Sequence, residues 1–381
     1  MFIVPLVMAA LPPSPPAFSW ATVPVFMHSG NSTGPLSAAA AQYMARFPLV
    51  TMAGFHGDGC CLEDHITQFA ASVKAASNAS ATVLYYQNTL INFPQAALSE
   101  TVPPELLVHD RRGRLVFLGG CGATKSAPNH TLYDHTQPAM RALWVGNVAG
   151  VVAANPGLVD GVFCDRSGSI ADVVKKDLHC YDLAADFAKH WNDGHWQTVA
   201  DTQAALDGLL NGSAIVIGNH AEPEASMHLD NNGSWNGKMY EHFVPARPYV
   251  PAGDQLAAFK RDAQLVVEAH VDFCDIHNAM YKSSLAAFLI GATAYDYYAC
   301  TNGWGFSDGW HTWSPDYDRP LGAPNGSAVR TKFGWRRAFA SGTEVWLDTE
   351  DQSGGAWGSS CIRWADGHVT KSGQGRGTPC S

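Results

Sequence analysis

A short apolar strand that ends on a carboxylate constrains this chain more than any other segment. Residues 159–165 read Val-Asp-Gly-Val-Phe-Cys-Asp, and a turn that opens a helix lies upstream at residues 132–141. A helix that leads into a buried strand is the repeating unit of a (β/α)8 barrel. On that fold the C-terminal ends of the strands carry the chemistry, so Asp165 is the first candidate for a catalytic residue.

Apolar runs bounded by turn residues recur at intervals that suit strands alternating with helices. The strands that we expect span residues 23–28, 49–55, 82–87, 161–165, 214–218, 238–243, 264–270 and 286–292. Helices are expected at 37–46, 63–76, 137–154, 181–192 and 198–210, with a β-hairpin inserted at 105–118. Because the strands are continuous apolar runs, they fit a parallel sheet covered by helices. The predicted fold class is therefore α/β, a (β/α)8 TIM barrel.

The two ends of the chain differ in character from this barrel. Short alternating runs around turns predict a small antiparallel β appendage at residues 334–381, which leaves 18–333 for a catalytic barrel. Residues 1–17 hold a short apolar run that fits the core of a secretory signal peptide, although a basic start is missing. That run is too short to cross a bilayer, and no later run reaches about 18 apolar residues, so no membrane span is expected.

Charge and sequons bear on partners and localisation. The 381-residue chain has 24 Lys and Arg against 34 Asp and Glu, a net charge of −10. Nucleic-acid phosphates require a basic footprint, so a nucleic-acid partner is not expected. Asn-x-Ser/Thr sequons become glycosylation sites only in the secretory pathway, and together with the N-terminal run they predict a secreted glycoprotein. The sequons begin at Asn31, Asn78, Asn129, Asn211, Asn232 and Asn325.

Nine cysteines should mostly form disulfides in an oxidising compartment. The odd count leaves at least one free, and Cys164, inside an expected strand, is the candidate for a buried free thiol. Cys361 and Cys380 could close the C-terminal segment. The adjacent Cys60 and Cys61 are not expected to bond to one another. The spacings match no zinc finger or zinc ribbon.

Two acidic residues at strand ends suggest cleavage of glycosidic bonds. Asp165 ends the fourth expected strand and Glu241 ends the sixth, so both can face the mouth of the barrel. One carboxyl can then protonate the leaving oxygen while the other attacks the sugar carbon or activates water. We expect Asp165 to be the nucleophile or base and Glu241 the general acid. The structural alternatives are a helix N-cap for Asp165 and an ion-paired loop residue for Glu241.

Other strand ends are polar or aromatic, as sugar hydroxyls and sugar faces require. Glu268, near the end of the seventh expected strand, could also be the second acid or the partner of a cation. A loop rich in Trp and Tyr follows the eighth expected strand and should overhang the mouth. Ordinary packing is the alternative for each of these residues taken singly. The candidates for substrate binding are His28, His56, Gln87, His220, Glu268, Tyr295, Asp296, Trp304 and Trp310.

No cofactor is expected from the motifs. The chain lacks a phosphate-binding glycine loop, an HExxH pair and a Gly-x-Ser-x-Gly turn. A metal site remains an alternative, in which several histidines converge with Asp165. These histidines are His56, His65, His220, His242 and His270.

Two motifs resemble those of uncharacterised glycoside-hydrolase-like (β/α)8-barrel proteins. Residues 134–138, Asp-His-Thr-Gln-Pro, followed by Asp-Gly-Val-Phe-Cys-Asp at 160–165, are similar to that family's "D-x-T-x-P … D-G-[IV]-F-x-D" pattern. Residues 317–324 and 335–346 resemble its closing segment, so the resemblance covers residues 130–350. It implies a (β/α)8 barrel that acts on carbohydrate, with Asp165 and Glu241 as the carboxylates.

The leading hypothesis is therefore a secreted glycoside hydrolase that cleaves a polysaccharide or oligosaccharide with two carboxylates. Carboxylates on the fourth and sixth strands recur in retaining barrels, which slightly favours retention of configuration. The alternatives are a non-catalytic carbohydrate-binding barrel and a metal-dependent hydrolase. The sequence leaves the sugar, the linkage, endo or exo action, the disulfide pattern and the oligomeric state open.

Overall fold

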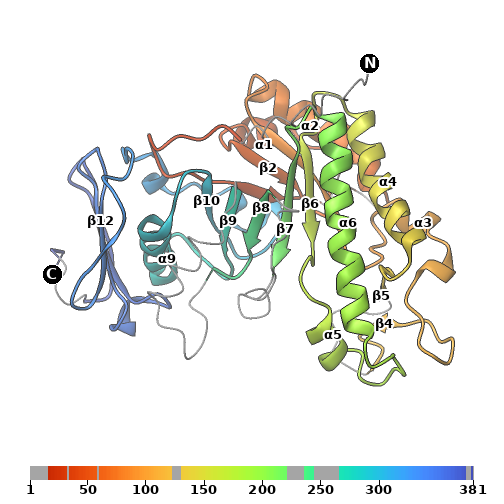
Figure 1. The fold of residues 1–381 in the computed structure, drawn as a ribbon. Coiled ribbons are helices and arrows are strands. Elements are labelled where there is room, and N and C mark those ends of the chain that lie inside the picture. The colour runs from red at the N-terminus through yellow and green to blue at the C-terminus, as the bar shows by residue number, and fades with distance from the viewer. Residues whose placement is uncertain are drawn as a thin grey trace, which may run out of the picture.

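Eight parallel strands and the helices between them form a nearly closed (β/α)8 barrel, which a five-stranded antiparallel sheet follows (Figure 1). The structure is a computed structural model. It describes residues 16–31, 34–57, 60–121, 130–220, 236–243, 266–374 and 379–380. The fold class predicted from the sequence, a TIM barrel with a small antiparallel appendage, is confirmed.

The barrel strands are hydrogen-bonded in the order β1-β2-β3-β6-β7-β8-β9-β10, each parallel to its neighbours. Where β10 meets β1, Val25 and Tyr298 form a parallel bridge, and the Phe26 N–H donates to the Tyr298 carbonyl at 3.4 Å. The bounds are β1 (Met27–Ser29), β2 (Leu49–Met52), β3 (Thr82–Asn88), β6 (Gly161–Asp165), β7 (Ile215–His220), β8 (Gly237–Tyr240), β9 (Val266–Val271) and β10 (Asp296–Cys300).

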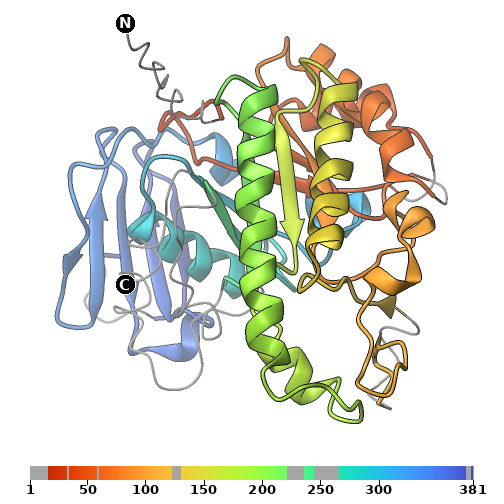
Figure 2. The same cartoon turned by 45° about the vertical axis from the view of Figure 1, so that its right-hand side comes forward.

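Helices cover the outside of the barrel, and α4 and α6 lie side by side there (Figures 1 and 2). In α2, apolar residues at helical spacing, such as Ile66, Phe69 and Val73, are buried against the strands. Pro138 begins α4, where its fixed φ and missing N–H cost nothing. The helices are α1 (Ala38–Met44), α2 (Leu62–Ala76), α3 (Leu98–Thr101), α4 (Pro138–Ala154), α5 (Ala171–Lys176), α6 (Phe187–Leu209) and α9 (Ala279–Gly291).

The eighth strand predicted at residues 286–292 is wrong. These residues belong to helix α9, and the eighth strand is β10. Helix α9 is buried on nearly all sides, between the barrel and the C-terminal sheet (Figure 1), so it has no polar face. A run that is apolar throughout does not distinguish a buried helix from a buried strand.

Two smaller predictions are corrected in the insertion and the helices. The helices expected at 181–192 and 198–210 are one helix, α6. In the hairpin expected at 105–118, His109 and Leu115 do pair antiparallel. Its second arm, however, runs on into β4 (Phe117–Leu118), which pairs with β5 (His130–Thr131).

The C-terminal sheet packs on the outer side of α9 (Figure 1). Arg337 joins the two: its Nη1 donates to the carbonyls of Leu289, Ile290 and Ala292 at 3.0, 3.3 and 2.6 Å. These carbonyls at the end of a helix lack intrahelical donors, so a buried guanidinium satisfies them. The strands are β11 (Val329–Arg330), β12 (Gly334–Ala338), β13 (Glu344–Asp348), β14 (Ser359–Arg363) and β15 (Val369–Ser372).

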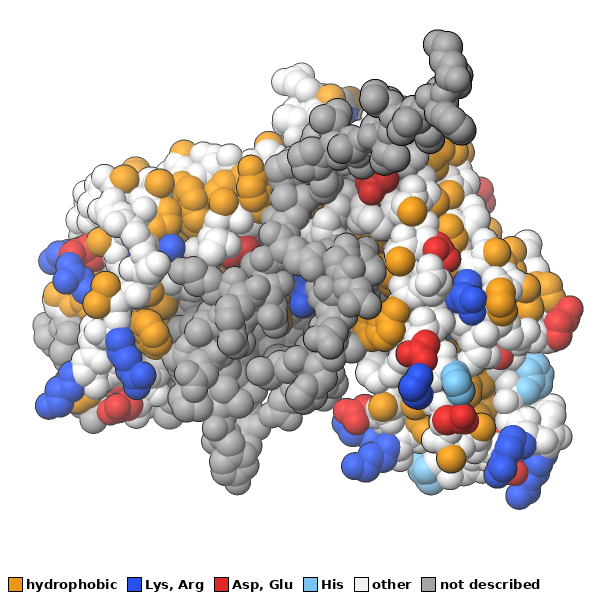
Figure 3. Space-filling model, viewed as in Figure 1, with side chains coloured by type: hydrophobic (Ala, Val, Ile, Leu, Met, Phe, Trp, Pro, Cys, Tyr) orange, Lys and Arg blue, Asp and Glu red, His pale blue; other side chains and the backbone are white. Residues whose placement is uncertain are grey.

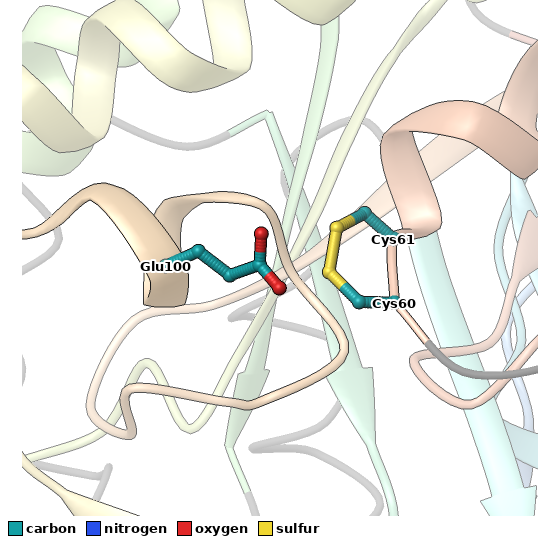
Figure 4. Close-up of side chains that lie close together, drawn as sticks. All are labelled: Cys60, Cys61 and Glu100. Atoms are coloured by element: carbon teal, nitrogen blue, oxygen red, sulfur yellow. A yellow bond between two sulfur atoms is a disulfide. The ribbon is translucent and has the colours of Figure 1, made fainter.

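Four disulfides are present among the described residues, and one of them corrects a prediction. Cys60 and Cys61 are bonded to one another, and the peptide between them is cis, with the two Cα atoms 3.0 Å apart (Figure 4). A trans peptide would hold these atoms about 3.8 Å apart, which is why the pairing was not expected. The predicted Cys361–Cys380 bond and the buried free thiol of Cys164 are confirmed. The remaining bonds are Cys121–Cys180 and Cys274–Cys300.

The surface carries no large field of one charge on the described part of the face in Figure 3, where Lys and Arg lie beside Asp and Glu. None of the helices in the described ranges has the length and hydrophobicity of a membrane span. Most of the predicted signal peptide, residues 1–15, lies outside the described residues.

Candidate active site

A pocket opens at the C-terminal ends of the barrel strands. Asp165 closes β6, Asn219 lies near the end of β7, and Glu241 directly follows β8. These three strands are neighbours, so their ends meet at one edge of the barrel. The pocket is lined by His28, Ala53, Gly54, Phe55, Tyr86, Phe93, Phe163, Asp165, Asn219, Glu241 and Trp304.

Four donors surround the carboxyl group of Asp165. Its Oδ2 accepts from the Tyr86 hydroxyl at 2.6 Å and the Asn88 amide at 3.0 Å. Its Oδ1 accepts from the Asn219 amide at 2.9 Å and from the backbone N–H of Arg166 at 2.8 Å. Arg166 has a φ of 51°, a left-handed conformation that is costly for a residue with a side chain. An ionised carboxylate only accepts hydrogen bonds, so this surrounding suits a charged Asp165.

Asn219 connects Asp165 to Glu241. Its Nδ2 donates to Oδ1 of Asp165 at 2.9 Å and to Oε2 of Glu241 at 2.8 Å. Both oxygens bind one nitrogen, so they lie at most about 5.7 Å apart, the sum of the two distances. The two carboxyl groups therefore face the same small volume of the pocket.

Glu241 lies in an environment that favours its protonated form. Burial raises the pKa of the Glu241 carboxyl above its ordinary value, and the charge of Asp165 raises it further. The hydrogen bond from Asn219 and the charge of His242 lower this pKa, whereas the charge of Asp272 raises it. A carboxyl group with a raised pKa beside a second carboxylate can act as a general acid.

His242 and Asp272 form an ion pair next to Glu241. The Nδ1 of His242 lies 2.7 Å from Oδ2 of Asp272, and the Nδ1 of the buried His270 lies 3.1 Å from Oδ1. Burial lowers the pKa of His270 to about 4, with the charge of Asp272 acting against this effect. The two side chains act in opposite directions on the Glu241 carboxyl, because His242 lowers its pKa and Asp272 raises it.

Aromatic side chains line the same pocket as the carboxyl groups. The His28 ring meets Phe163 edge-on at 4.4 Å and Trp304 at 4.8 Å between ring centroids. Burial lowers the pKa of His28 to about 3, so the ring is neutral at ordinary pH. A neutral imidazole donates with one nitrogen and accepts with the other, which suits a sugar hydroxyl. Sugar rings present C–H faces that pack well against such flat aromatic side chains.

Gly54 lets the loop after β2 come close to Tyr86. A Cβ at this position would lie 2.3 Å from the Tyr86 ring, closer than side-chain atoms approach one another. The glycine thus makes room for the ring that bonds Asp165, and Phe55 next to it lines the pocket. The glycine in this loop therefore allows the Tyr86 hydroxyl to reach Asp165.

Of the predicted substrate-binding residues, His28 and Trp304 line the pocket. Trp310 is buried behind them, stacked on His270 with centroids 5.5 Å apart. His220 ends β7, but its side chain lies outside the described residues.

Three other residues that were predicted to bind substrate do not line the pocket. The Nδ1 of His56 accepts from the Asn31 backbone N–H, and its ring packs on Phe69. Gln87 points away from the barrel axis, because its Oε1 accepts from Asn147 of α4. Glu268 is fully buried in β9, and neither carboxyl oxygen has a hydrogen-bond partner among the described residues.

Tyr295 and Asp296 lie at the wrong end of the barrel for substrate binding. They were placed after a strand at 286–292, but they directly precede and begin β10, so they lie at the N-terminal ends of the strands. Tyr295 packs against Phe18 with ring centroids 5.2 Å apart. Asp296 accepts from the backbone N–H and the hydroxyl of Thr293. Their predicted role at the mouth is therefore corrected.

Sequence reasoning missed several residues that shape the site. Tyr86 lies inside β3 and looks like an ordinary strand residue, although alternation along β3 places it on the same face as Asn88. Phe55, Phe93 and Asp272 lie in loops, where no periodic pattern applies. The sequence signal for Tyr86 is the alternation of side chains along β3. Residues on one face of this strand lead to the polar Asn88 at its end, and Tyr86 lies on that face.

Two clusters in the described part offer grouped metal-ligand atoms. Glu241, His242 and Asp272 each place one ligand atom within 4.8 Å of the others, but the His242–Asp272 ion pair already joins two of them. In the other cluster, Glu100 of α3 points toward Cys60 and Cys61 (Figure 4). Those sulfurs are bonded to one another and offer no thiolate. Among the described side chains, the predicted convergence of histidines on Asp165 is not seen: His56 lies near His65, and His270 lies against Asp272.

The chain is a (β/α)8-barrel glycosidase. Residues 75–343 match the model of hypothetical glycosyl hydrolase family 15, and the chain belongs to that family. The resemblance inferred from the two sequence motifs is thereby confirmed. The protein is a glycosidase of this family, and carbohydrate is its substrate class.

Several solved structures are similar to this chain. The glycoside hydrolase domain of PelA from Pseudomonas aeruginosa is 14% identical, with a TM-score of 0.44 over 72% of this chain and 93% of that chain. Alpha-L-fucosidase isoenzyme 2 from Paenibacillus thiaminolyticus is 13% identical, with a TM-score of 0.48 over 78% of this chain and 48% of that chain. Alpha-amylase from Geobacillus thermoleovorans is 8% identical, with a TM-score of 0.48 over 86% and 87%. These are distant likenesses, and the assignment rests on the family model. No curated protein matches the chain.

Proposed function

We propose that this chain is a retaining glycoside hydrolase that cleaves a polysaccharide or oligosaccharide, with Asp165 as nucleophile and Glu241 as general acid and base. The observation that carries this proposal is the shared hydrogen-bond donor, which limits the distance between Oδ1 of Asp165 and Oε2 of Glu241 to at most about 5.7 Å. Retaining glycosidases place their carboxyl groups about 5–5.5 Å apart, whereas inverting enzymes leave about 6.5–9.5 Å for a water molecule.

The reaction then has two steps. In the first, a carboxylate oxygen of Asp165 attacks the anomeric carbon while the bond to the leaving oxygen breaks. Glu241 gives its proton to that oxygen, and a glycosyl ester on Asp165 results. In the second step Glu241 takes a proton from water, the water oxygen attacks the anomeric carbon, and the ester bond breaks to free Asp165. The raised pKa of Glu241 supports the first role, because the acid must still hold its proton when substrate binds.

The test is digestion of a glycan panel by the wild type and by two isosteric variants. We expect Asp165→Asn and Glu241→Gln to keep the fold and to lose most activity, and the wild type to release a product whose anomeric configuration, followed by NMR, matches the substrate. Wild-type-like turnover by either variant would refute the two-carboxylate mechanism. Binding of glycans without hydrolysis would favour a non-catalytic barrel, and loss of activity in chelator would favour a metal-dependent hydrolase.

Secretion is part of the proposal. The four disulfides suit an oxidising compartment. Of the sequon asparagines, Asn78, Asn211 and Asn325 are exposed, Asn31 is half-buried, and Asn129 and Asn232 lie outside the described residues. Expression in a eukaryotic secretory host, with glycosidase treatment and mass spectrometry of the secreted chain, should show glycans at the three exposed sites. Retention of the unglycosylated chain inside the cell would contradict secretion.

A further inference from the structure

Asn219 does more than line the pocket. We infer that Asn219 is a positioning residue that dictates which oxygen of Glu241 carries the acid proton: by donating to Oε2 of Glu241 and to Asp165 at once, it reserves Oε1 for that proton. This inference rests on the proposed function, because it assigns Glu241 the role of acid. It extends that function, because the Asn219 amide at the end of β7 would position both carboxyl groups.

The geometry fixes the Asn219 side chain between the two carboxyl groups. β7 runs between β6 and β8, so its C-terminal end lies between the ends that carry Asp165 and Glu241. The Asn219 backbone carbonyl accepts from the Ser167 N–H at 3.1 Å, which ties the loop after β6 to the same residue. Asn219 is only 4% exposed. The amide is therefore held by its own strand and by the loop that follows Asp165.

The chemistry of the amide determines how it is oriented. Its nitrogen has two N–H groups and accepts nothing, so each N–H can serve one carboxyl oxygen. An amide oxygen in the same place would face the acceptor oxygen of Asp165, with which it cannot form a hydrogen bond. An oxygen of Glu241 that accepts from Nδ2 at 2.8 Å is a poor place for the acid proton, which would point at another donor. The proton is then left on Oε1, the Glu241 oxygen that Asn219 does not bind, and Oε1 would give it to the leaving oxygen of a substrate.

One further observation supports a functional role for this orientation. The Oδ1 of Asn219 is buried and has no hydrogen-bond partner among the described residues. A buried unpaired acceptor destabilises a protein, and buried polar groups in native structures are mostly paired. At Asn219 the unpaired oxygen accompanies an amide nitrogen that reaches both carboxyl groups.

Several groups act on Glu241 besides Asn219. Asp165 faces it from β6, His242 follows it, Asp272 lies beside His242, and the backbone of Glu241 contacts His270 of β9. Among these, the Asn219 hydrogen bond and the His242 charge favour the ionised carboxylate. Removal of the Asn219 amide therefore leaves the proton bound more tightly. It also allows either oxygen of Glu241 to carry that proton.

The experiment compares pH profiles of kcat/KM for the wild type, Asn219→Ala and Tyr86→Phe on a substrate that the wild type cleaves. Tyr86 is the matched control, since its hydroxyl donates to Asp165 and accepts from Asn88, whereas the Asn219 amide bonds Asp165 and Glu241. Misplaced catalytic groups cost up to about 100-fold in rate, so we expect Asn219→Ala to lower kcat about 10- to 100-fold. Its alkaline limb should move to higher pH by about one unit. In Tyr86→Phe the rate should fall while the alkaline limb stays in place.

An alkaline limb in Asn219→Ala that coincides with the wild-type limb would overturn the inference, as would an equal shift in Tyr86→Phe. If the alanine variant loses its cooperative unfolding transition, Asn219→Leu, which is similar in size and has no donor, gives the same readout. Failure of the proposed function would look different. In that case Glu241→Gln would keep wild-type activity and its alkaline limb, whatever Asn219→Ala does.

Discussion

The Tyr86 hydroxyl donates a 2.6 Å hydrogen bond to Oδ2 of Asp165 from the neighbouring strand. Burial raises the pKa of Tyr86 well above its ordinary value, and the charge of Asp165 raises it further. The hydroxyl therefore stays protonated at any working pH. It is a permanent neutral donor to the carboxylate that is proposed to attack the sugar.

Removing this donor should weaken catalysis without removing the ring. Tyr86→Phe keeps the packing on Phe163, whose ring lies nearly parallel at 6.2 Å. A hydrogen bond to a charged group contributes about 1.5–3 kcal/mol, so kcat/KM should fall roughly 10- to 100-fold. Steady-state kinetics measure this loss, and an unchanged kcat/KM would show that Tyr86 does not act on Asp165.

A methyl group at Gly54 should disturb the same contact from the other side. Its Cβ would lie 2.3 Å from the Tyr86 ring, so Gly54→Ala must displace that ring from Asp165. We expect activity to fall at least about tenfold, as for other misplaced catalytic groups. Gly146→Ala in α4 is the matched control, because a Cβ there meets nothing within 4 Å. Equal activity in the two variants would contradict the account of this loop.

The pH dependence of stability should report on Glu268. Burial raises the pKa of this carboxyl well above its ordinary value of 4.5, so the folded protein keeps a proton that the unfolded chain releases. The stabilising contribution is complete below pH 4.5 and is lost as the pH rises toward the folded-state pKa. Thermal unfolding of Glu268→Gln should therefore show a weaker loss of Tm between pH 4.5 and 8 than the wild type, by about a few degrees. Parallel Tm profiles for the two proteins would show that Glu268 is not protonated in the fold.

Arg337 should matter more for stability than its neighbour Arg336. Arg337 is buried and binds three carbonyls at the end of α9, whereas Arg336 is half-exposed and pairs with Glu344 on the outer face of the sheet. Burial lowers the pKa of Arg337 to about 10, so its charge persists at neutral pH. Arg337→Ala should cost about 3 kcal/mol in the free energy of unfolding, and Arg336→Ala less than about 1 kcal/mol. Urea unfolding measures both, and equal losses would contradict the anchoring role.

The sequence predicts the barrel and its two carboxylates because both depend on local patterns. A continuous apolar run that ends on an acid is visible in residues 161–165, and the same reasoning places Glu241 after β8. The same reasoning gives the wrong result for helix α9, because this helix is buried on nearly all sides and carries no polar face. Because the eighth strand was predicted at residues 286–292, Tyr295 and Asp296 were expected at the C-terminal ends of the strands. They lie instead at the N-terminal ends.

The rest of the site depends on which strands become neighbours and on side-chain direction. Asn88 and Asn219 follow or end strands and were visible as polar strand ends. Their bonds to Asp165, however, depend on the parallel register of β3, β6 and β7. Gln87 and Asn88 are adjacent in the sequence, yet only Asn88 points toward Asp165, since alternate residues of a strand face opposite sides. The disulfide between Cys60 and Cys61, whose peptide bond is cis, was indicated by no residue pattern.

Trapping of the glycosyl-enzyme tests the central claim most directly. The protein would be incubated with a panel of 2-deoxy-2-fluoro glycosyl fluorides, which form the ester quickly and hydrolyse it slowly, and the adduct would be mapped by peptide mass spectrometry. The two-carboxylate account predicts one added sugar on Asp165 of the wild type and none on Asp165→Asn. An adduct on another residue, or hydrolysis of natural substrate with inverted configuration and no adduct at all, would contradict it.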